Sequence, residues 1–586
     1  MLFSAALYHT LNPSYITGLI PRPPHSFPEG PSGSDEFDDP WHQYGHEHPP
    51  NATPEEWRAR AEQVKQAFLH AYHGYEQYAA PHDELKPLTN RSIDNFNGWG
   101  VTVFDSLDTM LLMDLKEEFT RAMAIVRNST FTMPINIPST DARDKPRKVY
   151  APFFETVIRY LGGLLSAYAL SHDTVLLDKA ENLGRLLSPA FGTESGLPYF
   201  GVNTVTGLTN GGAVGILAEA ASCQLEYAYL AKATGQKEFY EKSANIMRAL
   251  EKVDLSKLGM FPKTFNLESG TPLDEVLSVG GAADSAHEYL LKLYLLTTQS
   301  DKAALDLYIQ TTTRIISTLI YITPKRGLLY VTDTANSASW PSPSRKFEHL
   351  SCFLPGLLTL GVHTLPASAF QVPYTNFVGA SAELLHYDLR EMHMLAAEGI
   401  AESCWIMYAD QPSELGPEEA IMRQGVTWLE QLKRWRESGG QGAMPGTQRQ
   451  KPVRVPGIEA RDYALRRTSH LLRPETIESM YLMWKTTGDT RWRDRAWGIF
   501  EALEREAKTE AGYAVLGNVE HSLGPKQDGM PSYFLAETLK YLYLMFHEED
   551  LVPLDRWVFN TEAHPLPVFA WSPEERSKFG IADTDV

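Results

Sequence analysis

The sequence predicts an all-α fold in which seven helical pairs close into a toroid. Three observations lead to this prediction. Apolar residues recur at helical spacing through nearly all of the chain after Pro54. A loop containing Gly or Pro, then an acidic or polar residue, then an apolar helix occurs seven times. The repeat is near 65 residues, which accommodates two helices and two loops, and stacked pairs bury the apolar faces that none could bury alone.

The ends of the chain differ from this body. Residues 21–54 are rich in Pro, Gly, Ser, Asp and His and show little apolar periodicity, so we expect 1–54 to be a flexible or extended N-terminal segment. Thr53 with Pro54 and Glu56 then predicts the start of the first helix. The predicted domain runs over 55–570, and 571–586 form a C-terminal tail.

The repeat can be followed from one polar residue to the next. The markers are Asp105, Glu155, Glu219, Asp284, His349, Glu475 and Glu537. Most intervals between them are 50 to 65 residues, and the one double-length interval, before Glu475, contains one further helix and an inserted loop at about 409–465. The alternative is an open helical solenoid, but such arrays have shorter repeats and do not require an acidic residue at the start of helix after helix.

Composition and charge limit the possible functions. The chain has 586 residues with 53 Lys and Arg against 73 Asp and Glu, a formal charge of -20, which repels polyanions; we therefore expect no nucleic-acid partner. No stretch of 18 apolar residues predicts a transmembrane segment, and the first 20 residues lack the basic start of a conventional leader. Three N-x-S/T sequons, at Asn51, Asn90 and Asn128, could accept N-glycans. Three cysteines allow one disulfide and one free thiol.

The acidic markers suggest chemistry once they are considered together. One carboxylate near a helix start is ordinarily a cap that stabilises the helix by about 0.3 to 1 kcal/mol. Carboxylates at the same phase of successive hairpins would converge on one end of the cavity of a closed toroid. With Arg159, Arg473 and His349 among them, the cavity has the groups for acid and base catalysis on a neutral polar substrate. Glycoside cleavage most plainly needs two carboxyl groups, one protonated and one ionised.

Several motifs then resemble a known family. "FFETVIRYLGGLLSAY", "EHLSCFLPG", "LLRPETIES" and above all "FNTEAHPLP" (559–567) are similar to those of the class I α-1,2-mannosidases, glycoside hydrolase family 47, in the family's order from about residue 55 to 570. The resemblance implies a single (α/α)7 barrel. It also implies an inverting, calcium-dependent exo-enzyme that trims terminal α-1,2-linked mannose from high-mannose N-glycans.

The resemblance assigns roles motif by motif. It places Glu155 and Asp284 on the acid side, without deciding which donates the proton, and makes Glu475 the base that activates water. Thr561 would bind Ca²⁺ through its carbonyl and hydroxyl oxygens, which leaves room for waters and sugar hydroxyls. Further residues expected at the substrate are Arg159, Glu219, His349, Arg473, Glu478, Tyr533, Glu537 and Glu562, of which Tyr533 stands where the family usually has Phe beneath the sugar ring.

The cysteines match the family as well. Cys352 and Cys404 occupy the positions of its disulfide, which indicates an oxidising compartment: the lumen of the endoplasmic reticulum or Golgi, or secretion. Cys223 is expected to be an inert buried thiol. We expect a monomer.

Three positions depart from the family, and two alternatives remain. Ala282 replaces an Arg of members selective for one glycan branch, which predicts broader branch tolerance; Pro531 replaces a usual Glu, and Glu348 a usual Asp. The first alternative is a mannose-glycan-binding quality-control lectin, related to the degradation-enhancing mannosidase-like proteins, with weak turnover. The second is a toroid with only a scaffold role. The complete "LLRPETIES" and "FNTEAHPLP" motifs favour the enzyme.

Overall fold

The computed structural model describes residues 52–137, 147–335, 342–371, 383–384 and 386–582. Most of the N-terminal segment predicted at 1–54, the sequon at Asn51 and the last four residues of the tail lie outside these ranges. The described part of the tail contains α20 (Pro573–Phe579), whose Phe579 packs on Tyr240 together with Trp571.

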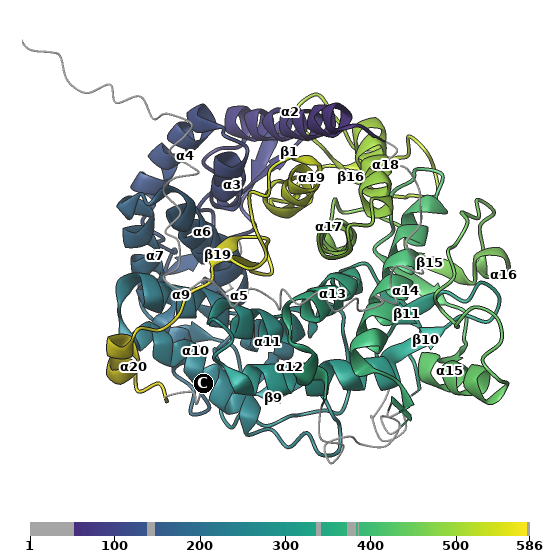
Figure 1. Ribbon diagram of the computed structural model, residues 1–586. Coiled ribbons are helices and arrows are strands. Elements are labelled where there is room, and N and C mark those ends of the chain that lie inside the picture. Colours follow the sequence, from purple (N-terminus) through teal and green to yellow (C-terminus); the bar gives the residue numbers. More distant parts are fainter. Residues whose placement is uncertain (1–51, 138–146, 336–341, 372–382, 385, 583–586) are drawn as a thin grey trace, which may run out of the picture. The chain divides into compact units, whose positions relative to one another are not determined.

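Seven helices form an inner ring around the centre of the domain (Figure 1). In order they are α3 (Val101–Leu112), α6 (Gly162–Ser171), α9 (Gln224–Thr234), α11 (Asp284–Leu296), α13 (Leu354–Thr364), α17 (Glu475–Thr487) and α19 (Leu539–Phe546). Each packs on the next, and the π-helical turn η9 (Phe534–Thr538) that precedes α19 packs on α3, so the ring closes. These helices are buried on nearly all sides; in α11 every residue except Asp284 is buried.

Seven outer helices each cover one inner helix. They are α2 (Pro54–Tyr78), α4 (Lys116–Asn128), α7 (Thr174–Leu187), α10 (Lys237–Glu251), α12 (Lys302–Arg314), α14 (Leu389–Ala409) and α18 (Arg491–Glu506). Most are amphipathic: in α7 the buried residues Leu176, Ala180, Leu183 and Leu187 recur every three or four positions. Inner and outer helices alternate along the chain, which is the architecture of an (α/α)7 barrel and confirms the predicted fold class.

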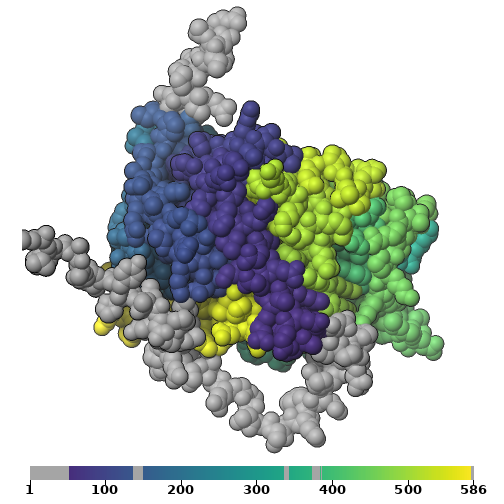
Figure 2. Space-filling model, turned by 90° about the horizontal axis from the view of Figure 1, so that it is seen from above, coloured from purple at the N-terminus to yellow at the C-terminus, as the bar shows by residue number. Residues whose placement is uncertain are grey.

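The first and last helices of the domain complete the barrel together. α2 packs against α19, nearly 500 residues later in the sequence, and Trp57 stacks on Phe546 with ring centroids 5.6 Å apart. Figure 2 shows the purple start of the domain in contact with its yellow-green end. The predicted helix start is also confirmed: the Thr53 hydroxyl accepts from the Glu56 amide, and the Glu56 carboxylate accepts from the Thr53 amide.

Short antiparallel strands fill the loops at the ends of the helices. Three of the described sheets have three strands. The first contains β11 (Leu329–Val331), β10 (Ile320–Ile322) and β14 (Val426–Thr427), and the second contains β12 (Lys346–Glu348), β13 (Glu419–Met422) and β15 (Tyr463–Arg467). A third contains β5 (Ala151–Pro152), β6 (Gly201–Val202) and β7 (Thr209–Asn210). The remaining pairs are β1 (Glu84–Lys86) with β2 (Arg91–Ile93), β3 (Asn136–Ile137) with β4 (Arg147–Lys148), β8 (Val214–Ile216) with β9 (Thr264–Asn266), and β16 (Val515–Leu516) with β17 (Lys526–Gln527).

The segment 409–465, predicted as an inserted loop, contains regular structure. It holds α15 (Trp428–Glu437) and α16 (Ile458–Arg461), and its strands pair with strands outside it: β13 with β12 and β14 with β10. The Gly-, Arg- and Pro-rich stretch at 439–455 has neither helix nor strand.

A hairpin near the C-terminal end of the chain enters the ring (Figure 1), and we call it the floor of the ring. Its strands are β18 (Trp557–Phe559) and β19 (Pro565–Pro567), and the turn between them carries the sequence Asn560 to His564. Gly162 allows α6 to approach this turn, because a Cβ atom at Gly162 would lie only 2.6 Å from the Asn560 amide nitrogen.

The three cysteines are placed as the sequence predicts. Cys352, in the short helix η5 (Leu350–Phe353) just before α13, forms a disulfide with Cys404 of α14, and Cys223 is free and buried. Asn90 and Asn128, the two described sequon asparagines, are exposed. No helix in the described ranges combines the length and apolar character needed to cross a membrane.

Candidate active site

The polar markers lie at one end of the ring. Asp284 and Glu475 are the first residues of α11 and α17, and His349 directly precedes the short helix that leads into α13. Glu155, Glu219 and Glu537 lie in the turns that lead into α6, α9 and α19. Because all seven inner helices present their N-terminal ends to the same side, a seven-fold pattern in the sequence becomes a cluster of carboxyl groups in space.

Glu475 is held by two partners, the ring of His349 and the guanidinium of Arg473. Its Oε2 lies 2.7 Å from Nδ1 of His349, and its Oε1 lies 3.7 Å from a guanidinium nitrogen of Arg473. Burial alone would raise the pKa of Glu475, but the interaction with His349, mainly through its hydrogen bond, and the charge of Arg473 hold it below its ordinary value. Glu475 is therefore an ionised carboxylate at neutral pH.

Asp284 has no such partner. Its Oδ1 accepts a hydrogen bond from the Ser285 amide at 2.8 Å, and no cation in the described ranges pairs with it. Burial, with smaller contributions from the charges of Glu288, Glu475 and Glu348, raises the pKa of Asp284 to about 7, although the hydrogen bond from the Ser285 amide opposes this shift. Near neutral pH, Asp284 can therefore hold and release a proton.

The loop that precedes Asp284 is anchored by the side chain of Glu348. Glu348 accepts from the Gly281 amide at 3.3 Å, and the Lys346 ammonium donates to its other carboxylate oxygen at 2.6 Å. A Cβ atom at Gly280 would lie 1.7 Å from Glu348 Oε2, so this close approach requires glycine. The side chain of Glu348 thereby lies against the loop that leads into Asp284.

Arg159 connects Glu155 to the floor. Its Nε donates to Glu155 at 2.8 Å, and one terminal nitrogen contacts Glu562 and lies 3.6 Å from Asp105. Arg159 is 7% exposed and sits in the π-helical turn η2 (Thr156–Leu161), a wide turn that is frequent at functional sites. The pKa of Glu219 is raised, mainly because Glu219 is partly buried and also because the charge of Glu155 lies nearby.

The floor of the ring has more negative charge than its cations balance. Burial is the main cause that raises the pKa of Glu478 and of Glu562 to about 8, and that raises the pKa of Glu537 well above its ordinary value. Mutual repulsion contributes, because the charges of Glu562, Glu475 and Glu478 all act on Glu537. A bound cation would relieve this repulsion and keep these carboxylates ionised.

Thr561 lies in the turn at the centre of this floor, and a network of buried groups fixes that turn. Asn560 donates from its amide nitrogen to Glu226 at 2.8 Å and to the Ile158 carbonyl at 2.9 Å, and its oxygen accepts from the amides of Glu562 and His564. Within the described ranges, no three His, Cys, Asp or Glu side chains group as direct metal ligands. The carbonyl and hydroxyl oxygens of Thr561 are oxygen atoms of the kind that Ca²⁺ binds.

Tyr533 presents its ring between two arginines. The guanidinium carbons of Arg473 and Arg159 lie 5.6 and 5.9 Å from the ring centroid, and the Tyr533 hydroxyl donates to the Leu471 carbonyl at 2.8 Å. The hydroxyl that distinguishes this residue from Phe is thus satisfied by the protein, which leaves the ring as an aromatic surface.

Sequence reasoning did not identify several residues that support the site. Glu418 accepts from Arg473 Nε at 2.8 and 2.9 Å, and Tyr408 contacts the far nitrogen of His349. Asp105 was noted only as a repeat marker, although it lies beside Arg159. Glu418 and Tyr408 belong to segments outside the repeated helix starts, so no pattern in the sequence singled them out.

The barrel and its buried polar groups define a class of protein. An ionised carboxylate and a carboxyl with a pKa near neutrality, set among buried polar groups beside an aromatic ring, are what a glycoside hydrolase requires. The chain belongs to that class: residues 67–568 match the profile of glycosyl hydrolase family 47, and the chain is a member of this family.

Named relatives agree with the family. The chain is 32% identical over 533 residues to the mannosyl-oligosaccharide alpha-1,2-mannosidase IA of Drosophila melanogaster, covering 89% of this chain and 69% of that protein. It is 35% identical over 519 residues to the human mannosyl-oligosaccharide 1,2-alpha-mannosidase IC, covering 87% and 71%. Among solved structures, the alpha-1,2-mannosidase from Trichoderma reesei matches with a TM-score of 0.71 and 27% identity, covering 87% of this chain and 99% of that one.

Proposed function

We propose that this protein is an inverting, calcium-dependent exo-α-1,2-mannosidase that trims terminal α-1,2-linked mannose from high-mannose N-glycans. The observation that carries the proposal is that Glu475 and Asp284 lie close enough for the charge of one to act on the other, while their pKa values shift in opposite directions. The names of the relatives, which are mannosyl-oligosaccharide 1,2-alpha-mannosidases, supply the sugar and the linkage.

In the proposed reaction, Glu475 takes a proton from water as that water attacks the anomeric carbon. His349 and Arg473 keep Glu475 ionised and aimed for this step. On the other side, Asp284 holds the proton that the departing sugar oxygen needs, because its pKa lies near neutrality. Glu155, which is fixed by Arg159, is the second acidic group on that side and can orient an intervening water. Attack by water opposite to the leaving group inverts the anomeric configuration.

Calcium binding is proposed at Thr561. The ion would be held by the Thr561 carbonyl and hydroxyl oxygens, with Glu478, Glu537 and Glu562 holding its waters, and it would supply ligand positions for two sugar hydroxyls. Arg159, Glu219, His349, Arg473 and Tyr533 are proposed to line the same sugar subsite.

The calcium proposal gives a testable prediction that does not depend on turnover. Thr561→Ala should weaken Ca²⁺ binding by about 10- to 100-fold and remove most of the calcium-dependent rise in melting temperature, because binding to the folded state stabilises it. Thr561→Ser keeps both oxygens and should behave like the wild-type protein. Equal calcium-dependent shifts in all three proteins would place the ion elsewhere.

Branch tolerance is proposed from Ala282, which lies half-buried in the loop before Asp284. Its carbonyl accepts from the Ala218 amide at 3.1 Å, which ties this loop to the helix that carries Glu219. A methyl group leaves the space that a longer side chain would occupy, so several glycan branches should be accepted. We propose that the protein works as a monomer in the secretory pathway, which agrees with its disulfide.

One measurement tests the whole proposal. A time course on a nine-mannose N-glycan with branch-resolved products should show successive loss of α-1,2-linked residues, with β-mannose as the first anomer released. The alternative, a lectin with weak turnover, predicts glycan binding with the nine-mannose species unchanged. Products with retained configuration would reject the roles of Glu475 and Asp284.

A further inference from the structure

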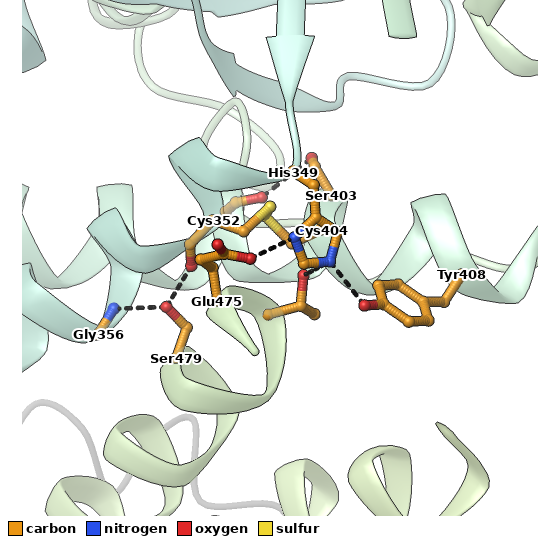
Figure 3. The surroundings of a disulfide bond; sticks show 10 residues. His349, Cys352, Gly356, Ser403, Cys404, Tyr408, Glu475 and Ser479 are labelled. Atoms are coloured by element: carbon orange, nitrogen blue, oxygen red, sulfur yellow. Dashed lines mark hydrogen bonds and ion pairs between the residues drawn. A yellow bond between two sulfur atoms is a disulfide. The ribbon is translucent and has the colours of Figure 1, made fainter. Parts of the chain in front are cut away.

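The base candidate Glu475 belongs to a buried chain of hydrogen bonds that reaches the outer helix α14 (Figure 3). Nδ1 of His349 lies 2.7 Å from Glu475, and Nε2 of the same ring lies 2.6 Å from the Tyr408 hydroxyl. The Thr476 hydroxyl lies 3.3 Å from that Nε2. His349 is 5% exposed and Tyr408 1%, so bulk water does not replace these contacts.

Two covalently joined segments carry this chain. His349 lies three residues before Cys352 and Tyr408 lies four residues after Cys404, so the disulfide joins the segments that present the two side chains to each other. Ser479, one turn after Glu475 on α17, donates to the Cys352 carbonyl and accepts from the Gly356 amide at 2.9 Å. The three elements that carry Glu475, His349 and Tyr408 are therefore fixed to one another beside the disulfide (Figure 3).

We propose that Tyr408 is a positioning residue for the base: its hydroxyl holds Nε2 of His349, so that the Nδ1–H of the ring points at Glu475. This inference rests on the proposed function of Glu475. An imidazole can rotate about its Cβ–Cγ bond, which would replace Nδ1 by a carbon facing Glu475, and the bond at Nε2 opposes that rotation. Burial keeps the pKa of Tyr408 well above its ordinary value, so the hydroxyl remains a proton donor.

The role differs from simple support of the core. A structural tyrosine would contribute to folding without affecting the protonation of Glu475. A positioning tyrosine should affect the pH at which the base becomes protonated. The reason is that the hydrogen bond from His349 is the largest of the effects that lower the pKa of Glu475 against the effect of burial.

The test compares Tyr408→Phe with wild type in kcat, KM and pH profile on a mannose-terminated oligosaccharide. We expect kcat to fall about tenfold with KM nearly unchanged, and the acidic limb of kcat/KM to move up by about half a pH unit. The control is Tyr330→Phe: Tyr330 is buried in β11, and its hydroxyl has no hydrogen-bond partner in the described part of the chain. A Tyr408→Phe enzyme with wild-type kcat and pH profile would overturn the inference, whatever its melting temperature.

A second measurement needs no folded variant of Tyr408 and no turnover. In wild-type protein labelled with ¹⁵N-histidine, the His349 signals, assigned by their loss in His349→Gln, should show a protonated Nδ1 at neutral pH. A bare Nδ1 would overturn the inference. If the wild-type protein released no mannose, the proposed function would fail, while this measurement would still decide how the His349 ring is held.

Discussion

α11 and α17 begin with a carboxyl residue in the same structural position, and their surroundings drive the two pKa values apart. Asp284 and Glu475 each occupy the first position of an inner helix, where the helix dipole favours the ionised form of both. Burial opposes ionisation in both cases. At Glu475 the partners His349 and Arg473 overcome burial, whereas Asp284 meets other carboxylates. The repeat therefore places the groups, and the loops between helices assign their roles.

Among the changes that test this comparison, Glu475→Gln should reduce turnover the most. An amide cannot take a proton from water, so we expect kcat to fall by at least about 10³-fold, while an unreactive sugar analogue binds with nearly the same affinity. Glu419→Gln, a change in the neighbouring sheet, is the control. Turnover near the wild-type rate would show that another group is the base.

Asp284→Asn should have the next largest effect. We expect a loss of about 10²-fold, because the amide has no proton of suitable acidity to donate. The pH profile of the wild-type enzyme tests whether Asp284 acts as the proton donor. A donor must be protonated, so wild-type kcat/KM should fall as pH rises through about 7, the pKa of Asp284. That basic limb should disappear in Asp284→Asn; if it persists, the limb belongs to another group, with Glu155 as the next candidate.

Arg473→Met should raise the pKa of Glu475 and so bring it closer to the pKa of Asp284. Loss of the nearby positive charge raises the pKa of Glu475, so the acidic limb of kcat/KM should move to higher pH by about half a unit or more, with kcat about tenfold lower. Arg466→Met removes an arginine that pairs with Glu419 at the surface, and should leave the profile in place. An unmoved acidic limb in Arg473→Met would mean that His349 alone keeps Glu475 ionised.

Glu348→Gln should have the smallest effect, and it should act on the pKa of Asp284 and not on that of Glu475. The charge of Glu348 helps to raise the pKa of Asp284, so its removal should move the basic limb to lower pH by a few tenths of a unit. Glu419 faces Glu348 across the β12–β13 pair and is a matched control. A shift to higher pH would contradict the assigned electrostatics.

The sequence predicted the ring and the convergence of its acidic residues, because both follow from a repeat of helix starts. The repeat alone does not say which carboxyl stays ionised; only the resemblance of the motif around Glu475 to a known family made that residue the expected base, and the contacts that lower its pKa are not visible in the sequence. Arg473 stands beside Glu475 in the sequence, but Tyr408 reaches the base only through His349, and Glu348 reaches Asp284 from 64 residues away. The same limit applies to 409–465, where strands form because their partners lie in distant loops.

The hairpin that forms the floor of the ring is made late. A growing chain has passed all seven inner helices before it supplies Asn560, Thr561 and Glu562, and Lys540, on the last of those helices, then donates to the Ala563 carbonyl at 2.6 Å. A nascent chain that has completed the seven inner helices therefore still lacks the turn at which we propose that Ca²⁺ binds. The proposed reaction would thus have to wait until synthesis has reached the end of the domain.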